Sequence, residues 1–248
     1  MGKKSRVKFV SFSGIDGAGK STQIDNLCAR LKDNGLRVEL IRFWDDIATL
    51  TGVRETTGHK VFKGDKGVGS PSAPINRRDK NVQSPLMTGV RLFLYFLDAV
   101  SVRLVVKRAL RSDADVVVFD RYTYDELANL NLRSPAIRAY VRLIMAFVPK
   151  PDISYVLDAD PVKARARKPE YPLEFLHRNR QAYLTLSELV GGLTVIAPNE
   201  IEQVKREVVE RALRELSLEM ENVGGGIPGH HDTEATQLDG PQVRPAAF

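Results

Sequence analysis

The chain has 248 residues, of which 43% are hydrophobic and 27% charged, and its 37 Lys and Arg residues exceed its 31 Asp and Glu residues by six. This length suits one α/β domain or two small ones, and the apolar fraction is too high for a wholly disordered chain. A single cysteine excludes an intramolecular disulfide framework and a cysteine-based zinc cage. The basic surplus indicates an anionic partner without identifying it.

The N-terminal residues read as a charged leader into a first strand, because their apolar run is short and lacks a small-residue cleavage site. No apolar run approaches the ~18 residues that a membrane-spanning helix needs. We therefore expect a soluble, cytoplasmic protein that does not engage a membrane.

The first elements follow one another closely. Val7–Ser13 is a β-rich run that stops at a glycine, and apolar residues at helical spacing then predict a helix over Ser21–Asn34, with Gly35 as its stop. Arg37–Phe43 reads as a second strand. A strand, a helix and a strand in succession favour a parallel sheet.

The stretch 51–85 breaks this pattern, because it is rich in Gly, Pro, Ser and basic residues; we expect a basic, flexible insertion. Strands and helices alternate after it. Near the C-terminus the composition changes, which predicts a disordered tail over 221–248. Helices are expected over Leu86–Leu110, Pro172–Leu189 and Glu200–Leu216. Another is expected to begin at the N-cap Ser134, with Pro135 at its first helical position, and to run to about Val148. The strands are expected over Asp115–Asp120, Asp152–Leu157 and Leu193–Ala197. We predict an α/β chain with one domain over 1–220 and a five-stranded parallel sheet covered by helices on both faces.

The strongest motif lies between the first strand and the first helix. Residues 14–21 fit the pattern G-x-x-x-x-G-K-[ST], in which glycines let backbone N–H groups wrap around phosphates and the helix adds the positive end of its dipole. Lys20 would reach the β- and γ-phosphates, and the Ser21 hydroxyl would ligate Mg²⁺. The predicted ATP-binding residues are Gly14, Ile15, Asp16, Gly17, Ala18, Gly19, Lys20, Ser21 and Thr22.

Two strand ends carry further candidates, because ligands of open parallel sheets lie outside the carboxyl ends of the strands. Asp120 follows a buried apolar strand and could hold Mg²⁺ through water, while Arg121 beside it could bind phosphate bidentately. Arg42 ends the second strand and is a similar candidate. Surface ion pairs or exposed basic side chains are the alternative interpretation of these residues.

A basic cluster, Arg165–Lys168, follows the fourth strand. These cations could form a solvated helix face. After a phosphate-binding loop and an Asp-Arg pair, we favour a lid over about 160–175, in which Arg165 and Arg167 neutralise the transferring phosphoryl group.

These pieces, in this order, resemble the thymidylate kinase family of P-loop nucleoside monophosphate kinases. The matching segments are GIDGAGKST at 14–22, FDRY at 119–122, PKPDISYVLDADP at 149–161, the basic residues 165–168 and FLHRNRQAY at 175–183. The resemblance implies a three-layer P-loop NTPase fold, Mg²⁺ with ATP as the phosphoryl donor, and conversion of dTMP to dTDP. It also suggests a homodimer, while nothing in the sequence points to nucleic acid as a partner.

The resemblance also assigns acceptor-side roles to single residues. Asp16 stands where the family has a carboxylate that contacts the deoxyribose hydroxyl. Arg121 and Arg42 would hold the acceptor phosphate, and Tyr95 falls near the aromatic side chain that stacks on the base.

The catalytic residues follow from the same comparison. Family members with a small residue at the position of Gly17 tend to supply their catalytic arginine from the lid, and this chain has Arg165 and Arg167 there. With Lys20 and Arg121, these two arginines complete the predicted catalytic set.

The chain departs from the family on the acceptor side. The family's Pro-Gly-Gly after the second strand is absent, Ala99 replaces an arginine beside the base, and Asp125 stands in what is usually a Ser-Ser segment. Two alternatives therefore stay open. One is a P-loop kinase of another nucleotide, a deoxynucleoside or a metabolite. A free hydroxyl acceptor would need a base, and Asp45, Asp46 or Asp125 could serve. A non-catalytic nucleotide-binding module is the other.

Overall fold

The structure is a computed structural model that describes residues 6–48 and 85–216. Its centre is a five-stranded sheet in the order β2-β3-β1-β4-β5, in which every neighbouring pair is parallel. The strands are β1 (Lys8–Ser13), β2 (Val38–Arg42), β3 (Val116–Asp120), β4 (Ile153–Leu157) and β5 (Leu193–Ile196). The predicted α/β fold with a five-stranded parallel sheet is confirmed.

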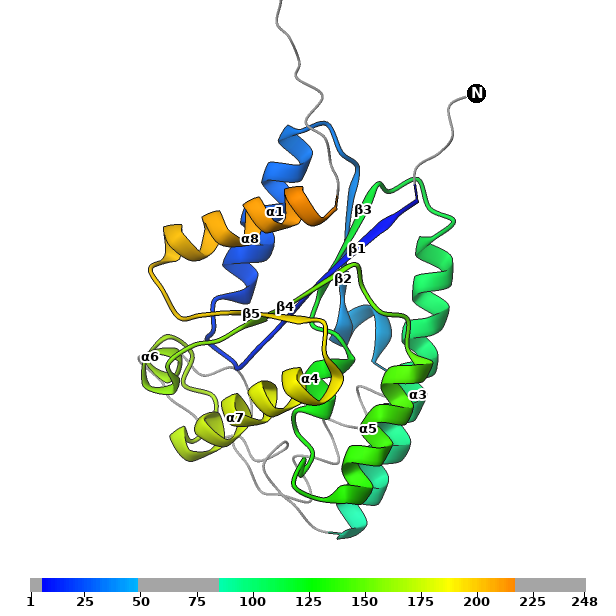
Figure 1. Cartoon of the computed structure of the whole chain (residues 1–248), viewed down its shortest axis with the longest axis vertical. Helices are drawn as coiled ribbons and strands as arrows, with labels where there is room; N and C mark the ends of the chain where they lie inside the picture. The colour runs from blue at the N-terminus through cyan, green and yellow to red at the C-terminus, as the bar shows by residue number, and fades with distance from the viewer. Residues whose placement is uncertain (1–5, 49–84, 217–248) are drawn as a thin grey trace, which may run out of the picture.

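Helices lie on both faces of this sheet, with α1 and α8 on one side and α3, α5 and α7 on the other (Figure 1). The helical elements are α1 (Lys20–Asp33), η1 (Phe43–Ile47, a π-helical turn), α3 (Pro85–Ala109), α4 (Thr123–Leu127), α5 (Pro135–Phe147), α6 (Pro161–Arg167), α7 (Leu173–Val190) and α8 (Ile201–Glu215).

Strand β3 explains why the sheet needs two covering layers. Its residues Val116–Phe119 are fully buried. Val117 and Phe119 belong to the hydrophobic cluster that includes residues of α3, α5 and α7, whereas Val116 and Val118 belong to the cluster that includes α1 and α8. Successive side chains of a strand point to opposite faces, so a strand covered on both faces reads as a continuous apolar run.

Most predicted boundaries agree with the structure to within one or two residues. Gly35 ends α1 as expected, with φ of 77° and a backbone N–H that donates to the Lys32 carbonyl at 2.8 Å. Two details differ. Phe43 begins η1 instead of ending β2, and the side chain of Ser134, at the N-cap of α5, makes no capping hydrogen bond.

Apolar periodicity does not predict three short elements, η1, α4 and α6. Each has five to seven residues, fewer than two helical turns, so apolar periodicity has too little length to appear. Two of them, α4 and α6, turn out to frame the candidate site described below.

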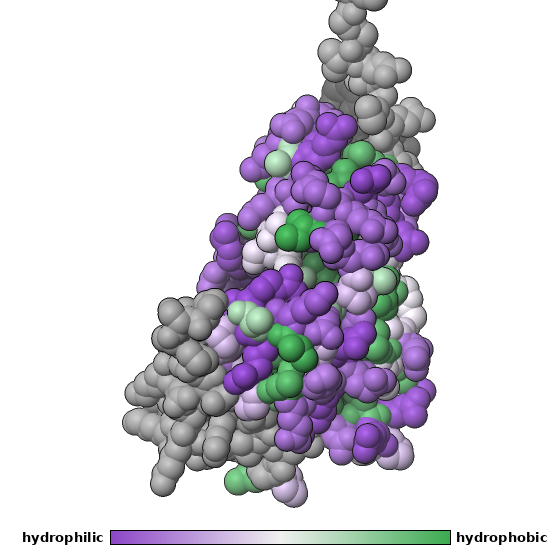
Figure 2. Space-filling model, turned by 90° about the vertical axis from the view of Figure 1, so that its left-hand side faces the viewer, coloured by the Kyte–Doolittle hydropathy of each residue, from purple (hydrophilic) through white to green (hydrophobic). Residues whose placement is uncertain are grey.

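The predicted insertion lies outside the described residues except for Pro85, which begins α3, and the predicted tail lies outside them entirely. In 6–48 and 85–216, no helix combines the length and the apolar composition needed to cross a bilayer. Figure 2 looks onto the side of the molecule that carries α8, α6 and α7 in Figure 1, and its coloured surface is mainly hydrophilic with a few small hydrophobic areas.

Candidate active site

The candidate site lies at the carboxyl edge of the sheet. Parallel register aligns Arg42 at the end of β2 with Asp120 at the end of β3, and Asp120 with Phe12 near the end of β1. The phosphate-binding loop begins two residues after Phe12. The sheet therefore brings these predicted residues to one edge, where ligands of open α/β sheets bind.

The loop between β1 and α1 has the backbone that its glycines predict. Gly14, Gly17 and Gly19 have φ angles of 141°, 83° and 89°, a region that residues with a Cβ rarely adopt. A Cβ at Gly14 would also lie 2.5 Å from the carbonyl oxygen of Leu157 at the end of β4. Because α1 begins directly after Gly19, the first N–H groups of the helix point toward the loop, as an anion site requires.

Lys20 is the buried cation of this loop. Only 6% of it is exposed, and its Nζ donates to the carbonyl oxygens of Gly14 at 2.8 Å and Ile15 at 2.9 Å. Burial, followed by the positive charge of Arg121, lowers the pKa of Lys20 to about 7. A phosphate at the loop would raise this pKa, since it would add negative charge beside the amine.

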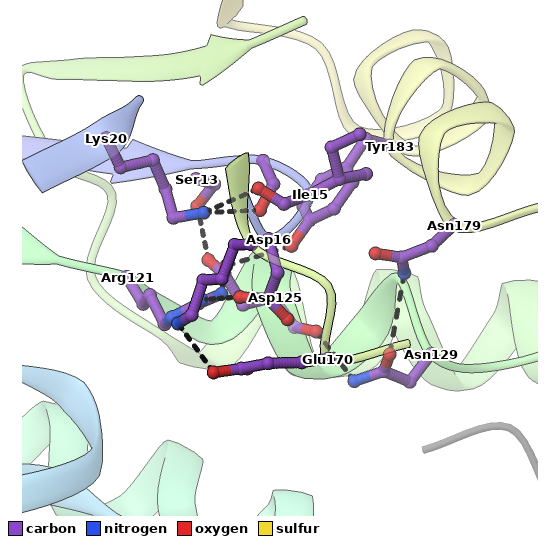
Figure 3. Close-up of polar contacts among 12 residues, drawn as sticks. Ser13, Ile15, Asp16, Lys20, Arg121, Asp125, Asn129, Glu170, Asn179 and Tyr183 are labelled. Atoms are coloured by element: carbon purple, nitrogen blue, oxygen red, sulfur yellow. Dashed lines mark hydrogen bonds and ion pairs between the residues drawn. The ribbon is translucent and has the colours of Figure 1, made fainter. Parts of the chain in front are cut away.

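Arg121 is the only non-glycine residue with positive φ (71°) in the described part of the chain. Its guanidinium reaches across the end of β1 and forms ion pairs with Asp16 through Nη2 and with Asp125 through Nη1, the latter at 2.7 Å (Figure 3). Burial opposes the charge of Arg121, but the carboxylates of Asp16 and Asp125 raise its pKa well above the ordinary value. Arg121 therefore links the end of β3 to the phosphate-binding loop.

Asp125 in α4, a candidate base in the sequence, accepts hydrogen bonds from four donors. Its Oδ1 accepts from Arg121 and from the Tyr183 hydroxyl at 2.8 Å, and its Oδ2 accepts from Ser13 Oγ at 2.6 Å and from the Tyr122 backbone N–H at 3.2 Å. The residue is 3% exposed. With both oxygens occupied by donors, Asp125 is poorly arranged to accept a proton from a substrate hydroxyl.

The basic segment after β4 forms helix α6, whose N-cap Asp160 accepts a hydrogen bond from the Lys163 N–H at 2.9 Å. This helix packs directly on the phosphate-binding loop, because a Cβ at Gly17 would lie 2.8 Å from the carbonyl carbon of Ala164 and closer still to its oxygen. Arg165 is half-buried and donates through Nε to the Tyr171 carbonyl at 3.0 Å, whereas Arg167 is exposed.

Two other predicted residues lie on α3 and at the end of β2. Tyr95 is buried in α3, within the hydrophobic cluster that includes Phe119. Arg42 is exposed, and its backbone N–H donates to Asp46 Oδ2 at 2.6 Å, which ties this residue of η1 to the end of β2.

The metal candidates are oxygen donors. Ser21 is exposed in the first turn of α1, and Asp120 is half-buried at the end of β3. No group of three or more His, Cys, Asp or Glu side chains among residues 6–48 and 85–216 could hold a metal by itself. A hydroxyl and a carboxylate suit Mg²⁺, which usually takes few protein ligands and is completed by substrate phosphates and water.

The roles of single residues of α7 were not predicted, although 175–183 is one of the segments that carry the resemblance. Its Asn179 donates to the Ala128 carbonyl at 3.3 Å, Tyr183 donates to Asp125, and Arg180 forms a bidentate ion pair with Asp158 at 2.6 and 2.7 Å. Asn179 and Tyr183 are four residues apart and therefore lie on one helix face. Two polar residues on an otherwise apolar helix face indicate a buried polar contact, and this pattern could have pointed to α7.

No family model matches the chain, but known proteins and a solved structure are similar to it. A probable thymidylate kinase of Thermococcus gammatolerans is 30% identical over 218 residues, covering 84% of this chain and 97% of that protein. One of Pyrococcus abyssi is 27% identical over 225 residues with the same coverage. The crystal structure of a thymidylate kinase from Ehrlichia chaffeensis, 20% identical, superposes with a TM-score of 0.53 over 84% of this chain and 99% of that one, which supports the fold. The chain belongs to the thymidylate kinase family.

Proposed function

We propose that this protein is a nucleoside monophosphate kinase that transfers the γ-phosphoryl group of ATP to dTMP and forms dTDP. Family membership supports the reaction, since relatives that are 27–30% identical are named thymidylate kinase or probable thymidylate kinase. The observation that carries the proposal is the ion pair between Arg121 and Asp16. It joins the arginine proposed for the acceptor phosphate to the loop proposed for the donor, so both substrates would meet at one edge of the sheet.

On the donor side, backbone N–H groups of residues 14–22 would surround the ATP phosphates. Lys20 would exchange its two loop carbonyls for phosphate oxygens and become fully protonated there. Ser21 and Asp120 would hold Mg²⁺, the latter through water. When bound, Mg²⁺ neutralises phosphate charge and orients the phosphates.

On the acceptor side, Arg121 and Arg42 would bind the phosphate, Asp16 the deoxyribose hydroxyl, and Tyr95 the base. The phosphate of a nucleoside monophosphate is mostly dianionic near neutral pH because its second pKa is ~6. It therefore needs no general base. This fits Asp125, whose carboxylate is occupied by four donors and which we do not propose as a base.

The lid would complete the site. Contact between α6 and the phosphate-binding loop at Gly17 puts Arg165 one residue from that contact, and Arg167 lies in the last turn of the same helix. Both arginines would neutralise charge on the transferring phosphoryl group and help to exclude water.

A homodimer through α3 is the proposed assembly. Leu86, Val90, Phe93 and Leu104 lie on one stripe of this helix and are 79%, 43%, 62% and 63% exposed. An exposed apolar stripe of this length favours a protein partner. The cytoplasm is the proposed compartment.

A coupled assay of ADP release across nucleoside monophosphates tests the function. We expect dTMP to be the preferred acceptor, with turnover abolished in Lys20→Ala. The matched control is Lys205→Ala, which changes a half-buried lysine of α8 that forms a long ion pair with Glu202 at 3.5 Å. Turnover with another acceptor only, or ATP binding without any turnover, would contradict the proposal.

A further inference from the structure

Arg121 forms two ion pairs, with Asp125 and with Asp16, and the two carboxylates lie in different surroundings. Its Nη1 donates to Asp125, whose side chain is 2% exposed and which also accepts from Ser13, Tyr122 and Tyr183. Its Nη2 donates to Asp16, which belongs to the phosphate-binding loop and is 8% exposed. One end of the guanidinium is therefore attached to a framework that draws on β1, α4 and α7, and the other to the loop that receives substrate.

The framework around Asp125 is built from donors that keep their protons. Burial, and then the negative charge of Asp125, raises the pKa of Tyr183 well above its ordinary value, so the hydroxyl stays a donor. The Tyr122 N–H is part of a capping box at the start of α4, and Ser13 is the last residue of β1. These contacts fix the carboxylate from three directions, independently of any substrate.

A phosphate that binds Arg121 must compete with the carboxylates already there. Losing Arg121 would leave Asp125 as a buried carboxylate without its counter-charge, which is costly. Exchange at Asp16 costs less, since its side chain is more exposed than that of Asp125, 8% against 2%, and lies in the loop that receives substrate. The contact that yields is then the one with Asp16.

We infer that Asp125 is a positioning residue for phosphoryl transfer: it holds Nη1 of Arg121 so that Nη2 is presented to the acceptor phosphate. This inference rests on the proposed function. It also gives a role to a carboxylate at a position where the resemblance leads one to expect a small hydroxyl residue. Asp125 does not touch substrate and acts only through Arg121.

The test separates phosphate recognition from general damage. Calorimetry would compare dTMP with thymidine, which lacks the phosphate, in the wild type and in Asp125→Asn. We expect Asp125→Asn to weaken dTMP binding about tenfold or more, as the loss of a charge-assisted hydrogen bond predicts, with thymidine and ATP affinities within about twofold of the wild type. The KM for dTMP should rise accordingly.

Two further variants keep the test informative. Tyr183→Phe removes a donor from the same oxygen of Asp125 without removing the carboxylate, so it should lower the melting temperature yet retain the difference in affinity between dTMP and thymidine. Asp125→Ser serves if Asp125→Asn does not fold, with the same expectation. In a double-mutant cycle, Arg121→Lys and Asp125→Asn should be non-additive for dTMP binding.

The outcomes are distinguishable. The inference would be overturned if Asp125→Asn kept the wild-type difference in affinity between dTMP and thymidine, or if it lost affinity equally for both ligands. Either result would leave the proposed function intact. Absence of dTMP turnover by the wild-type protein would overturn the proposed function itself.

Discussion

Gly17 of the phosphate-binding loop lies directly against the backbone carbonyl of Ala164 in α6, with no room for a Cβ between them. Two segments separated by almost 150 residues are thus in backbone contact, and the contact needs glycine twice: for its φ of 83° and for the missing side chain. A larger residue at position 17 would have to push α6 away from the loop.

We therefore predict that Gly17→Ala destabilises the protein more than Gly35→Ala. Gly35 has a similar φ of 77° but nothing within 4 Å of its Cβ position, so its replacement costs only the backbone strain, about 1 kcal/mol. Gly17→Ala adds the overlap with α6, a further ~1–3 kcal/mol. Denaturant unfolding without nucleotide would measure the difference, and equal losses would contradict the packing of α6 on the loop.

Lys20 predicts proton uptake on ATP binding. With a pKa of about 7, its amine is about 90% neutral at pH 8. ATP phosphates raise this pKa, so the bound state holds a proton that the free state lacks, and uptake approaches one proton per ATP at pH 8. It falls toward zero below about pH 6, where the amine is already charged. The lowered pKa of Lys20 also destabilises the folded protein without ATP. This cost begins below pH 10.5, the pKa of the unfolded state, and grows as the pH falls to about 7.

Calorimetry of ATP binding in buffers with different ionisation enthalpies would measure this uptake. Lys20→Arg is the matched control, because a guanidinium stays charged throughout this pH range and should abolish the uptake even if affinity falls. Identical apparent enthalpies in all buffers at pH 8 would show that the free enzyme already holds the proton.

Arg121→Lys tests the fork geometry. A lysine keeps the charge but cannot reach Asp16 and Asp125 with two rigidly spaced donors. We expect a loss of about 1–3 kcal/mol in the free energy of unfolding, and a fall of about 100-fold in kcat/KM for dTMP, with ATP affinity changed less than threefold. Parallel steady-state kinetics and ATP titration would check this. An equal loss for both substrates would contradict the assignment of Arg121 to the acceptor.

The sequence predicted the sheet and the phosphate-binding loop because both depend on local patterns. The sequence of β3 is apolar on both faces of the strand, and the spacing of the glycines in 14–21 is itself the motif of a phosphate-binding loop. The network of Asp125 could not be predicted, because its donors come from positions 13, 121, 122 and 183, and only the packing of α7 against α4 brings Tyr183 there. Short α6 was missed as a helix, though its basic residues were recognised.

The bidentate ion pair between Arg180 and Asp158 gives the last prediction. It connects α7 to the residue that follows β4, just before α6, and Asp158 is nearly buried, with 9% of its side chain exposed. We expect Arg180→Ala to cost about 1.5–3 kcal/mol of unfolding free energy, because it leaves that carboxylate without its counter-charge. Arg211→Ala, which removes a more exposed pair with Glu215, is the control and should cost less than about 0.5 kcal/mol. Because α6 begins three residues after Asp158, the same variant should reduce kcat more than ATP affinity. A loss no larger than that of Arg211→Ala would mean that the pair is a surface contact without a role in holding the lid.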